Sequence, residues 1–193
     1  MECKIIASEY FKPVSWSGGT TIELFIYPPG ADYLQRNFQF RLSTATVETE
    51  KSDFTSLPVI SRKLMVLEGS ISLSHEDRYS RQLEKFDIDS FEGDWKTSSL
   101  GKCTDFNLMT SGQTAGELSA IFLENEQNLR HKIKKSCDWF IIYLFSGKLS
   151  IDINNMIANL NKGDLLILNK TGARNFEIKS LENSELVFSE INL

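Results

Sequence analysis

The chain carries one pattern twice, as LMVLEGSISL at residues 64–73 and as IYLFSGKLSI at residues 142–151. Each copy is an apolar run, a turn that ends in glycine (Gly69 and Gly147), and a second run in which apolar and polar residues alternate. Short apolar runs and strict alternation are both typical of β-strands. Internal duplication of such a β-unit predicts two similar lobes.

A Gly-Asp pair follows each copy and opens a further strand, at Gly93-Asp94 in the first half and at Gly163-Asp164 in the second. We therefore expect these two pairs to form equivalent turns. The repeated order of strand, glycine turn, strand and Gly-Asp turn is similar to the centre of a cupin repeat, which is a jelly-roll β-barrel.

Alternation also marks the segments around the repeat. In residues 20–27 it places Ile22, Leu24 and Ile26 on one strand face. Turn-forming residues separate many such runs at short intervals, which indicates a sandwich or barrel. Further strands are predicted at 38–45, 62–67, 70–74, 104–110, 117–123, 139–145, 148–152, 164–168, 174–179 and 185–191.

Helical periodicity is almost absent from the chain. We expect little helix, with a single turn near Asp32–Arg36, and an ordinary connection over Tyr79–Glu84. No linker rich in proline, glycine or serine divides the sequence. The predicted lobes are residues 1–110, which hold the candidate site, and residues 111–193, with an approximate boundary that strands may cross.

Composition narrows the class of protein. The 193 residues carry a net charge of −5 with the two signs interspersed, whereas a nucleic-acid binder normally shows a basic stripe and a basic balance. Three cysteines without CxxC spacing argue against a disulfide framework and fit a reducing compartment. The N-terminus lacks the apolar core of a signal peptide, and the longest apolar run is too short to span a membrane. We expect a cytoplasmic protein that binds neither nucleic acid nor membrane.

Cupin enzymes usually hold a metal with closely spaced histidines, a glutamate and a later histidine. This chain has only His75 and His131, neither in an HxH pair, and Arg174 stands where the late histidine would fall. His75 lies in a charged hairpin segment and His131 in a charged stretch, so both are interpreted as surface histidines. We expect no metal and no other cofactor.

Seven ordered segments resemble the HutD/Ves family, whose members are double cupins. No single segment is specific for the family, but the occurrence of all seven in this order between about residues 13 and 110 is. They are Trp16-Ser17-Gly18-Gly19-Thr20-Thr21-Ile22-Glu23, Phe40-Arg41-Leu42-Ser43-Thr44-Ala45, Ser52-Asp53-Phe54 with Pro58, Arg62, Leu67-Glu68-Gly69, Phe91-Glu92-Gly93-Asp94 and Asp105-Phe106-Asn107-Leu108-Met109.

The resemblance implies an all-β double cupin (bicupin) of two jelly-roll β-barrel lobes. It also implies a link to histidine utilisation or its regulation in bacteria, and a small carboxylate ligand such as an N-formyl amino acid. A homo-oligomer is compatible with the sequence.

The candidate ligand-binding residues form pairs two positions apart on one strand face. Arg41 offers a planar fork of donors that matches a carboxylate, and Ser43 adds a hydroxyl. Asn107 can donate and accept, and Asp105 could hold an N–H group or orient Arg41. The structural alternative is an ion pair between strands. The margin of the site is expected to include Glu23, Thr20 and Trp16.

Three functions remain open on this evidence. The first is a metabolite-binding, regulatory protein that holds a small carboxylate without a metal. The second is a metal-independent enzyme that acts on a small carboxylate through Glu23 or Asp105 as acid and base. The third is a protein–protein adaptor with a vestigial pocket. Nothing in the chain resembles a Ser–His–Asp or Cys–His arrangement, so an enzyme is the less favoured class.

Overall fold

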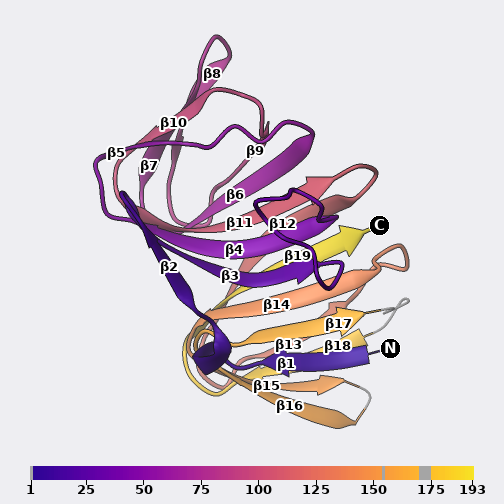
Figure 1. The fold of residues 1–193 in the computed structure, drawn as a ribbon. Helices are drawn as coiled ribbons and strands as arrows, with labels where there is room; N and C mark the ends of the chain where they lie inside the picture. The colour runs from indigo at the N-terminus through magenta and orange to yellow at the C-terminus, as the bar shows by residue number, and fades with distance from the viewer. Residues whose placement is uncertain (1, 154, 170–174) are drawn as a thin grey trace. The chain divides into compact units, whose positions relative to one another are not determined.

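The computed structural model describes residues 2–153, 155–169 and 175–193, and it divides them into two compact units (Figure 1). One unit is Phe11–Ala115, and the other joins Met1–Tyr10 to Gly116–Leu193. The first ten residues thus belong with the C-terminal half of the chain, whereas the sequence-based division placed them in the first lobe. β1 (Glu2–Ile6) explains this grouping, because it pairs antiparallel with β17 (Leu165–Asn169).

The Phe11–Ala115 unit contains two antiparallel sheets in its described residues. The larger has the strand order β2-β3-β4-β11-β6-β9 and the smaller has the order β5-β10-β7-β8. The larger sheet consists of β2 (Pro13–Trp16), β3 (Gly19–Tyr27), β4 (Phe40–Val47), β11 (Cys103–Ser111), β6 (Ile60–Gly69) and β9 (Ile88–Glu92). The smaller consists of β5 (Lys51–Asp53), β10 (Thr97–Leu100), β7 (Ile71–His75) and β8 (Tyr79–Leu83).

The other unit repeats this plan. Its sheets have the strand orders β1-β17-β14-β19-β12 and β13-β18-β15-β16. The strands are, besides β1 and β17, β14 (Trp139–Ser146), β19 (Ser184–Asn192), β12 (Ala115–Leu123), β13 (Asn128–Lys132), β18 (Asn175–Ser180), β15 (Lys148–Ile153) and β16 (Met156–Asn161). The orders β4-β11-β6-β9 and β12-β19-β14-β17 correspond strand for strand, as do the two four-stranded sheets.

The two sheets of each unit enclose an apolar core. In the Phe11–Ala115 unit, Leu64 and Val66 of the larger sheet pack with Ile71 and Leu73 of the smaller one. The corresponding core of the other unit is larger and includes Phe140. Because the alternating residues of each strand point to opposite faces, the inward face of every strand is set by this packing.

The Gly-Asp turns are not equivalent in the way that the sequence suggested. Gly163 donates to the Leu144 carbonyl at 2.7 Å, and the counterpart of that bond is Phe86 donating to the Val66 carbonyl at 2.7 Å. The correct equivalent of Gly163-Asp164 is therefore Phe86-Asp87. Gly163 has φ +87° and Phe86 has φ +69°, so both residues adopt the left-handed conformation. The match is not visible in the sequence because phenylalanine stands where the second unit has glycine.

Two local predictions were wrong. Tyr79–Leu83 forms the edge strand β8, in which only Leu83 is buried, so its polar composition reflects an exposed edge rather than a connection. The segment near Asp32–Arg36, where a turn of helix was expected, is not helical and makes a hydrogen-bonded turn, in which the Arg36 amide donates to the Tyr33 carbonyl at 3.2 Å. Among the described residues, the helical segment is the 3₁₀ turn η1 (Ser8–Tyr10), which fits the expectation of little helix.

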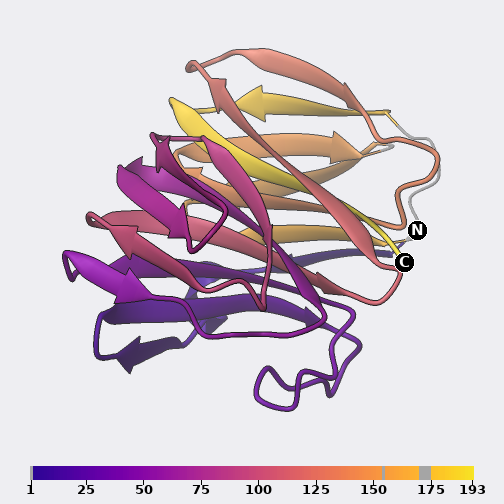
Figure 2. The ribbon, with the colours of Figure 1, turned by 90° about the horizontal axis from the view of Figure 1, so that it is seen from above.

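A bulge in β3 changes which side chains share a face. Glu23 pairs with Ser43, whereas Phe25 pairs with Leu42, so Leu24 is an extra residue between them. Ile22 and Ile26 therefore lie on opposite faces, although simple alternation placed them together. After the bulge, β3 ends at Tyr27, and the 28–39 connection leaves the sheet as a long loop before β4 (Figure 2).

The glycine turn of the repeat gives a direct test of the fold. Gly69 has φ +81°, and a Cβ there would lie 2.4 Å from the Lys102 carbonyl oxygen. Gly112 has φ +63°, and a Cβ there would meet nothing within 4 Å. We expect Gly69→Ala to lower the free energy of unfolding by more than about 2 kcal/mol, and Gly112→Ala by about 1 kcal/mol. Urea unfolding of both variants measures this, and equal losses would contradict the close approach at Gly69.

Candidate functional site

Polar side chains gather on the inward face of β4, β11 and β6. Ser43 pairs directly with Asn107, and Asn107 pairs with Leu64 of the apolar core. Directly opposed residues of an antiparallel pair point to the same face. Arg41 and Asp105 lie two residues from Ser43 and Asn107, so all four predicted side chains face the interior of the unit. Each is at most 6% exposed.

Arg41 is held by its neighbours on β3 and β4. Its Nε donates to Glu23 Oε2 at 2.7 Å, and its Nη1 donates to Ser43 Oγ at 2.9 Å. The ring of Tyr33, in the 28–39 loop, lies 4.5 Å from the guanidinium carbon. The Glu23 side chain is 42% exposed while that of Arg41 is 8% exposed, so this ion pair marks the solvent margin of the cluster. The predicted ion pair between strands therefore exists, through Glu23.

Arg62 is the principal residue that sequence reasoning missed as a site residue. Its guanidinium carbon lies 4.9 and 5.1 Å from the ring centroids of Phe54 and Phe91, which contact each other edge to face, and its Nη2 donates to Asn107 Oδ1 at 3.2 Å. Its Nε is buried without a hydrogen-bond partner, and within the described residues Arg62 forms no ion pair. Burial lowers the pKa of Arg62 to about 10, so the guanidinium is still charged at neutral pH but poorly compensated.

Asp105 is 3% exposed and accepts a hydrogen bond from Asn107 Nδ2. Burial raises the pKa of Asp105 to about 7, and the positive charge of Arg62 opposes that rise. Asn107 thus links the two charged groups, since its amide nitrogen donates to Asp105 while its oxygen accepts from Arg62. The cluster therefore holds a cation with an unfilled donor beside an acid that ionises near neutral pH.

Two predicted margin residues do not join the cluster. Thr20 pairs with Thr46, which lies three positions along β4 from Ser43 and so on the other face of the sheet. The ring of Trp16 lies against the backbone of Gly18, and Trp16 is 39% exposed on the edge strand β2. Neither residue contacts Arg41 in a described interaction. Glu23, the proposed partner of Asp105 in acid–base catalysis, is instead engaged by Arg41.

A sequence signal for Arg62 did exist. Arg62, Leu64 and Val66 alternate along one strand, so they share a face, and Leu64 and Val66 are fully buried core residues. The partners Phe54 and Tyr33 gave no such signal, because both come from irregular segments whose position depends on the tertiary structure.

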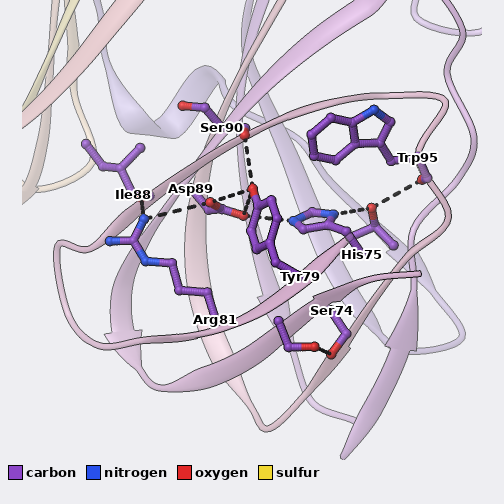
Figure 3. Close-up of polar contacts among 10 residues, drawn as sticks. Ser74, His75, Tyr79, Arg81, Ile88, Asp89, Ser90 and Trp95 are labelled. Carbon is purple, nitrogen blue, oxygen red and sulfur yellow. Dashed lines mark hydrogen bonds and ion pairs between the residues drawn. The ribbon is translucent and has the colours of Figure 1, made fainter. Parts of the chain in front are cut away.

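His75 is a buried residue and not a surface histidine (Figure 3). Its Nε2 lies 2.8 Å from Asp89 Oδ2, its Nδ1 lies 2.8 Å from Thr97 Oγ1, and the Tyr79 hydroxyl donates to Asp89 Oδ1 at 3.1 Å. Alternation with the buried Ile71 and Leu73 turns His75 inward, although charged residues follow it. Its ring centroid is 4.7 Å from that of Phe91, which also contacts Arg62.

His131 is also packed rather than exposed. Its ring lies 4.8 to 5.3 Å from those of Phe140, Phe176 and Phe188, and its Nε2 is buried without a hydrogen-bond partner among the described residues. Burial lowers the pKa of His131, which favours the neutral ring. Arg174 lies outside the described residues. Within the part of the chain that the structure describes, no group of three histidine, cysteine or acidic side chains is arranged to hold a metal ion.

The second unit has an apolar interior where the first has the polar cluster. Phe140 precedes Ile142 as Arg62 precedes Leu64, so it occupies the position of Arg62. Phe188 pairs with Ile142 as Asn107 pairs with Leu64. Phe140 and Phe188 are at most 1% exposed and belong to the apolar core. The buried cluster of guanidinium, amide and carboxyl groups is therefore a feature of the Phe11–Ala115 unit.

An open depression lies elsewhere on that unit and is lined by Glu76–Arg78 and Asp94–Lys96, none of which belongs to the cluster. No helix in the described part of the chain is long and apolar enough to cross a membrane.

The chain is similar to several solved structures. It aligns over its full length and that of the PA5104 protein from Pseudomonas aeruginosa PAO1, with 21% identity and a TM-score of 0.86. HutD from Pseudomonas fluorescens SBW25, in a structure described as a formate condition, gives 18% identity and a TM-score of 0.74 over 99% of this chain and 98% of that one. The bacterial pirin YhhW of Escherichia coli, in complex with nickel(II), gives 11% identity and a TM-score of 0.71 over 98% of each chain.

These likenesses confirm the expected all-β, double-cupin fold. No curated protein matches the sequence. A family model described as HutD matches residues 8–188, which is nearly the whole chain. The chain therefore belongs to the HutD family.

Proposed function

We propose that the chain binds a small carboxylate in the interior of the Phe11–Ala115 unit, beside Arg62 and Arg41, and acts as a regulatory binding protein without a metal. The observation that carries the proposal is the buried Arg62, whose Nε has no partner and whose charge is not balanced by an ion pair among the described residues. Burial of an unpaired charge is costly, so an anion bound there would relieve that cost.

The chemistry of the cluster favours a carboxylate. A guanidinium group presents donors in a plane, which matches the two oxygens of a carboxylate. The rings of Phe54 and Phe91 both contact the Arg62 guanidinium, while the Tyr33 ring contacts that of Arg41. Aromatic rings thus flank a small number of polar groups, a composition that is usual for sites that bind small metabolites. The formate condition of the related P. fluorescens structure is consistent with this class of ligand.

The hydrogen bonds of the two acidic groups favour binding over catalysis. Glu23 accepts a hydrogen bond from Arg41, and Asp105 accepts one from Asn107, so each carboxyl group holds a neighbouring side chain in position. N-formyl amino acids remain the expected members of the ligand class, by resemblance to the family. Formate and acetate are the simplest probes, since they carry the carboxylate alone.

The first test replaces Arg62 with methionine at pH 6, where Asp105 is largely neutral. We expect the free energy of unfolding of the free protein to change by less than about 1 kcal/mol, because apolar replacement of a buried charge is often neutral or stabilising. Formate at about 100 times its dissociation constant should stabilise the wild type by about 2.7 kcal/mol and the variant not at all. Thermal and urea unfolding with and without formate measure both effects.

The control for this test is Arg130→Gln, which removes an exposed arginine from the other unit and should leave the formate effect unchanged. A large loss of stability in Arg62→Met, together with no effect of formate on the wild type, would show that Arg62 is a structural residue.

A second test concerns Arg41. Arg41→Ala removes a donor group beside the proposed ligand, and we expect carboxylate binding to weaken by roughly 2–5 kcal/mol, the usual cost of truncating one partner of a buried charged pair. Titration calorimetry with acetate gives the dissociation constants. Glu23→Gln is the companion variant, since it removes the ion-pair partner of Arg41 and keeps the guanidinium. Unchanged acetate affinity in Arg41→Ala would remove Arg41 from the site.

The third test concerns metal content. The two histidines are packed in different units, His75 against Asp89 and His131 among phenylalanine rings. We therefore expect the purified protein to contain no stoichiometric transition metal. Elemental analysis that found about one iron, manganese, nickel or zinc ion per chain would contradict this.

A further inference from the structure

Asp105 and Arg62 are joined through one amide. Asn107 Nδ2 donates to Asp105 Oδ1, and Asn107 Oδ1 accepts from Arg62 Nη2 at 3.2 Å. Arg62 Nε is buried and has no hydrogen-bond partner among the described residues. The interior therefore contains a carboxyl group and a guanidinium that are close in the structure but not directly paired.

The charge state of Asp105 depends on what surrounds it. Arg62 on β6 is the cation that favours its ionised form, while burial opposes ionisation and raises the pKa of Asp105 to about 7. On β4, Arg41 is engaged by Glu23 of β3, and the phenol of Tyr33 lies over it. These groups place the ionisation of Asp105 within the physiological range of pH.

Cys103, on the same strand as Asp105, does not add a charge. Burial, together with the nearby Asp105, raises the pKa of the Cys103 thiol to about 12. The thiol is therefore neutral over the pH range in which Asp105 titrates. Of these two groups on β11, Asp105 is therefore the one whose charge would change between slightly acid and slightly alkaline solution.

With a proton on Asp105, the cluster offers mainly hydrogen-bond donors. Arg62 Nε is unfilled, and the Ser43 hydroxyl accepts from Arg41 and keeps its own hydrogen to donate. The Asn107 amide makes one hydrogen bond through each of its polar atoms, accepting from Arg62 and donating to Asp105. Such a site satisfies a carboxylate but disfavours an ammonium group, because the ammonium would lie near the positive charge of Arg62, which has no ion pair among the described residues.

We propose that Asp105 keeps its proton when a carboxylate binds beside Arg62, so that binding is coupled to proton uptake and the site discriminates against zwitterionic amino acids. This inference rests on the proposed function, because it concerns the same site. Ionised Asp105 and the ligand carboxylate compete for one guanidinium, and two carboxylates side by side cannot both ionise without a large cost.

The direction of the pH dependence follows from the proton balance. Below about pH 7 the free protein already carries the proton, so the affinity for a carboxylate is constant. Above about pH 7 the free protein has lost the proton and the complex regains it, so the affinity falls by roughly tenfold per pH unit. Replacing Asp105 by asparagine keeps a donor in place and removes the titrating group.

Titration calorimetry from pH 5.5 to 8.5 tests this with acetate, formate and glycine as probes. For the wild type we expect constant affinity for acetate below about pH 7, a fall of roughly tenfold per unit above it, and glycine bound at least tenfold more weakly than acetate. Asp105→Asn should show no fall. Asp94→Asn, which removes an exposed carboxylate from the same unit, should titrate like the wild type.

A second measurement needs no variant. At pH 7.5 and above, acetate binding in two buffers of different ionisation enthalpy should show net uptake of up to one proton per ligand. Acetate that binds with the same affinity at every pH and without proton uptake overturns the coupling and leaves the proposed function standing. Glycine that binds as tightly as acetate overturns the discrimination. Acetate and formate that fail to bind at any pH overturn the proposed function, and the inference with it.

Discussion

The buried guanidinium of Arg62 is the constraint on which the interior of the Phe11–Ala115 unit depends. A charge in that position must be surrounded by groups that reduce its desolvation cost, and each neighbour can be understood in this way. Phe54 and Phe91 present ring faces to it, and Asn107 gives it an oxygen. Asp105 is placed behind Asn107, where it influences the charge without neutralising it by a direct ion pair. This residual cost is the basis on which we propose an anionic ligand.

Duplication of the β-unit explains how the Phe11–Ala115 unit tolerates the desolvation cost of the buried Arg62. Both units share the order of four strands in the larger sheet and of the whole smaller sheet, and both have the glycine turn at Gly69 or Gly147, so they enclose interiors of the same kind. In the second unit that interior is filled by phenylalanine rings, including Phe140 and Phe188 at the positions of Arg62 and Asn107. Close apolar packing stabilises a fold, whereas a polar interior sacrifices stability for function. The repeats have therefore diverged into one unit with an apolar interior and one unit whose interior holds the polar cluster.

The histidines show how local composition misleads about burial. His75 stands before charged residues and His131 among them, yet both rings are packed against aromatic side chains. His75 is further fixed by Asp89 and Thr97, so its polar atoms are satisfied inside the protein. The network lies beside the candidate site through the shared Phe91, and it supports the ring on which Arg62 stacks.

The sequence by itself determined the all-β class, the duplicated unit, most of the strands and the grouping of Arg41 with Ser43 and of Asp105 with Asn107. These follow from the period of two in a strand, which is a local property of the chain. The tertiary structure decided the rest. The bulge at Leu24, the outward face of Thr20 and the equivalence of Phe86 with Gly163 depend on cross-strand register. The contact of Arg62 with the rings of Phe54 and Phe91, and the raised pKa of Asp105, depend on burial by residues distant in sequence, which alternation along one strand does not encode.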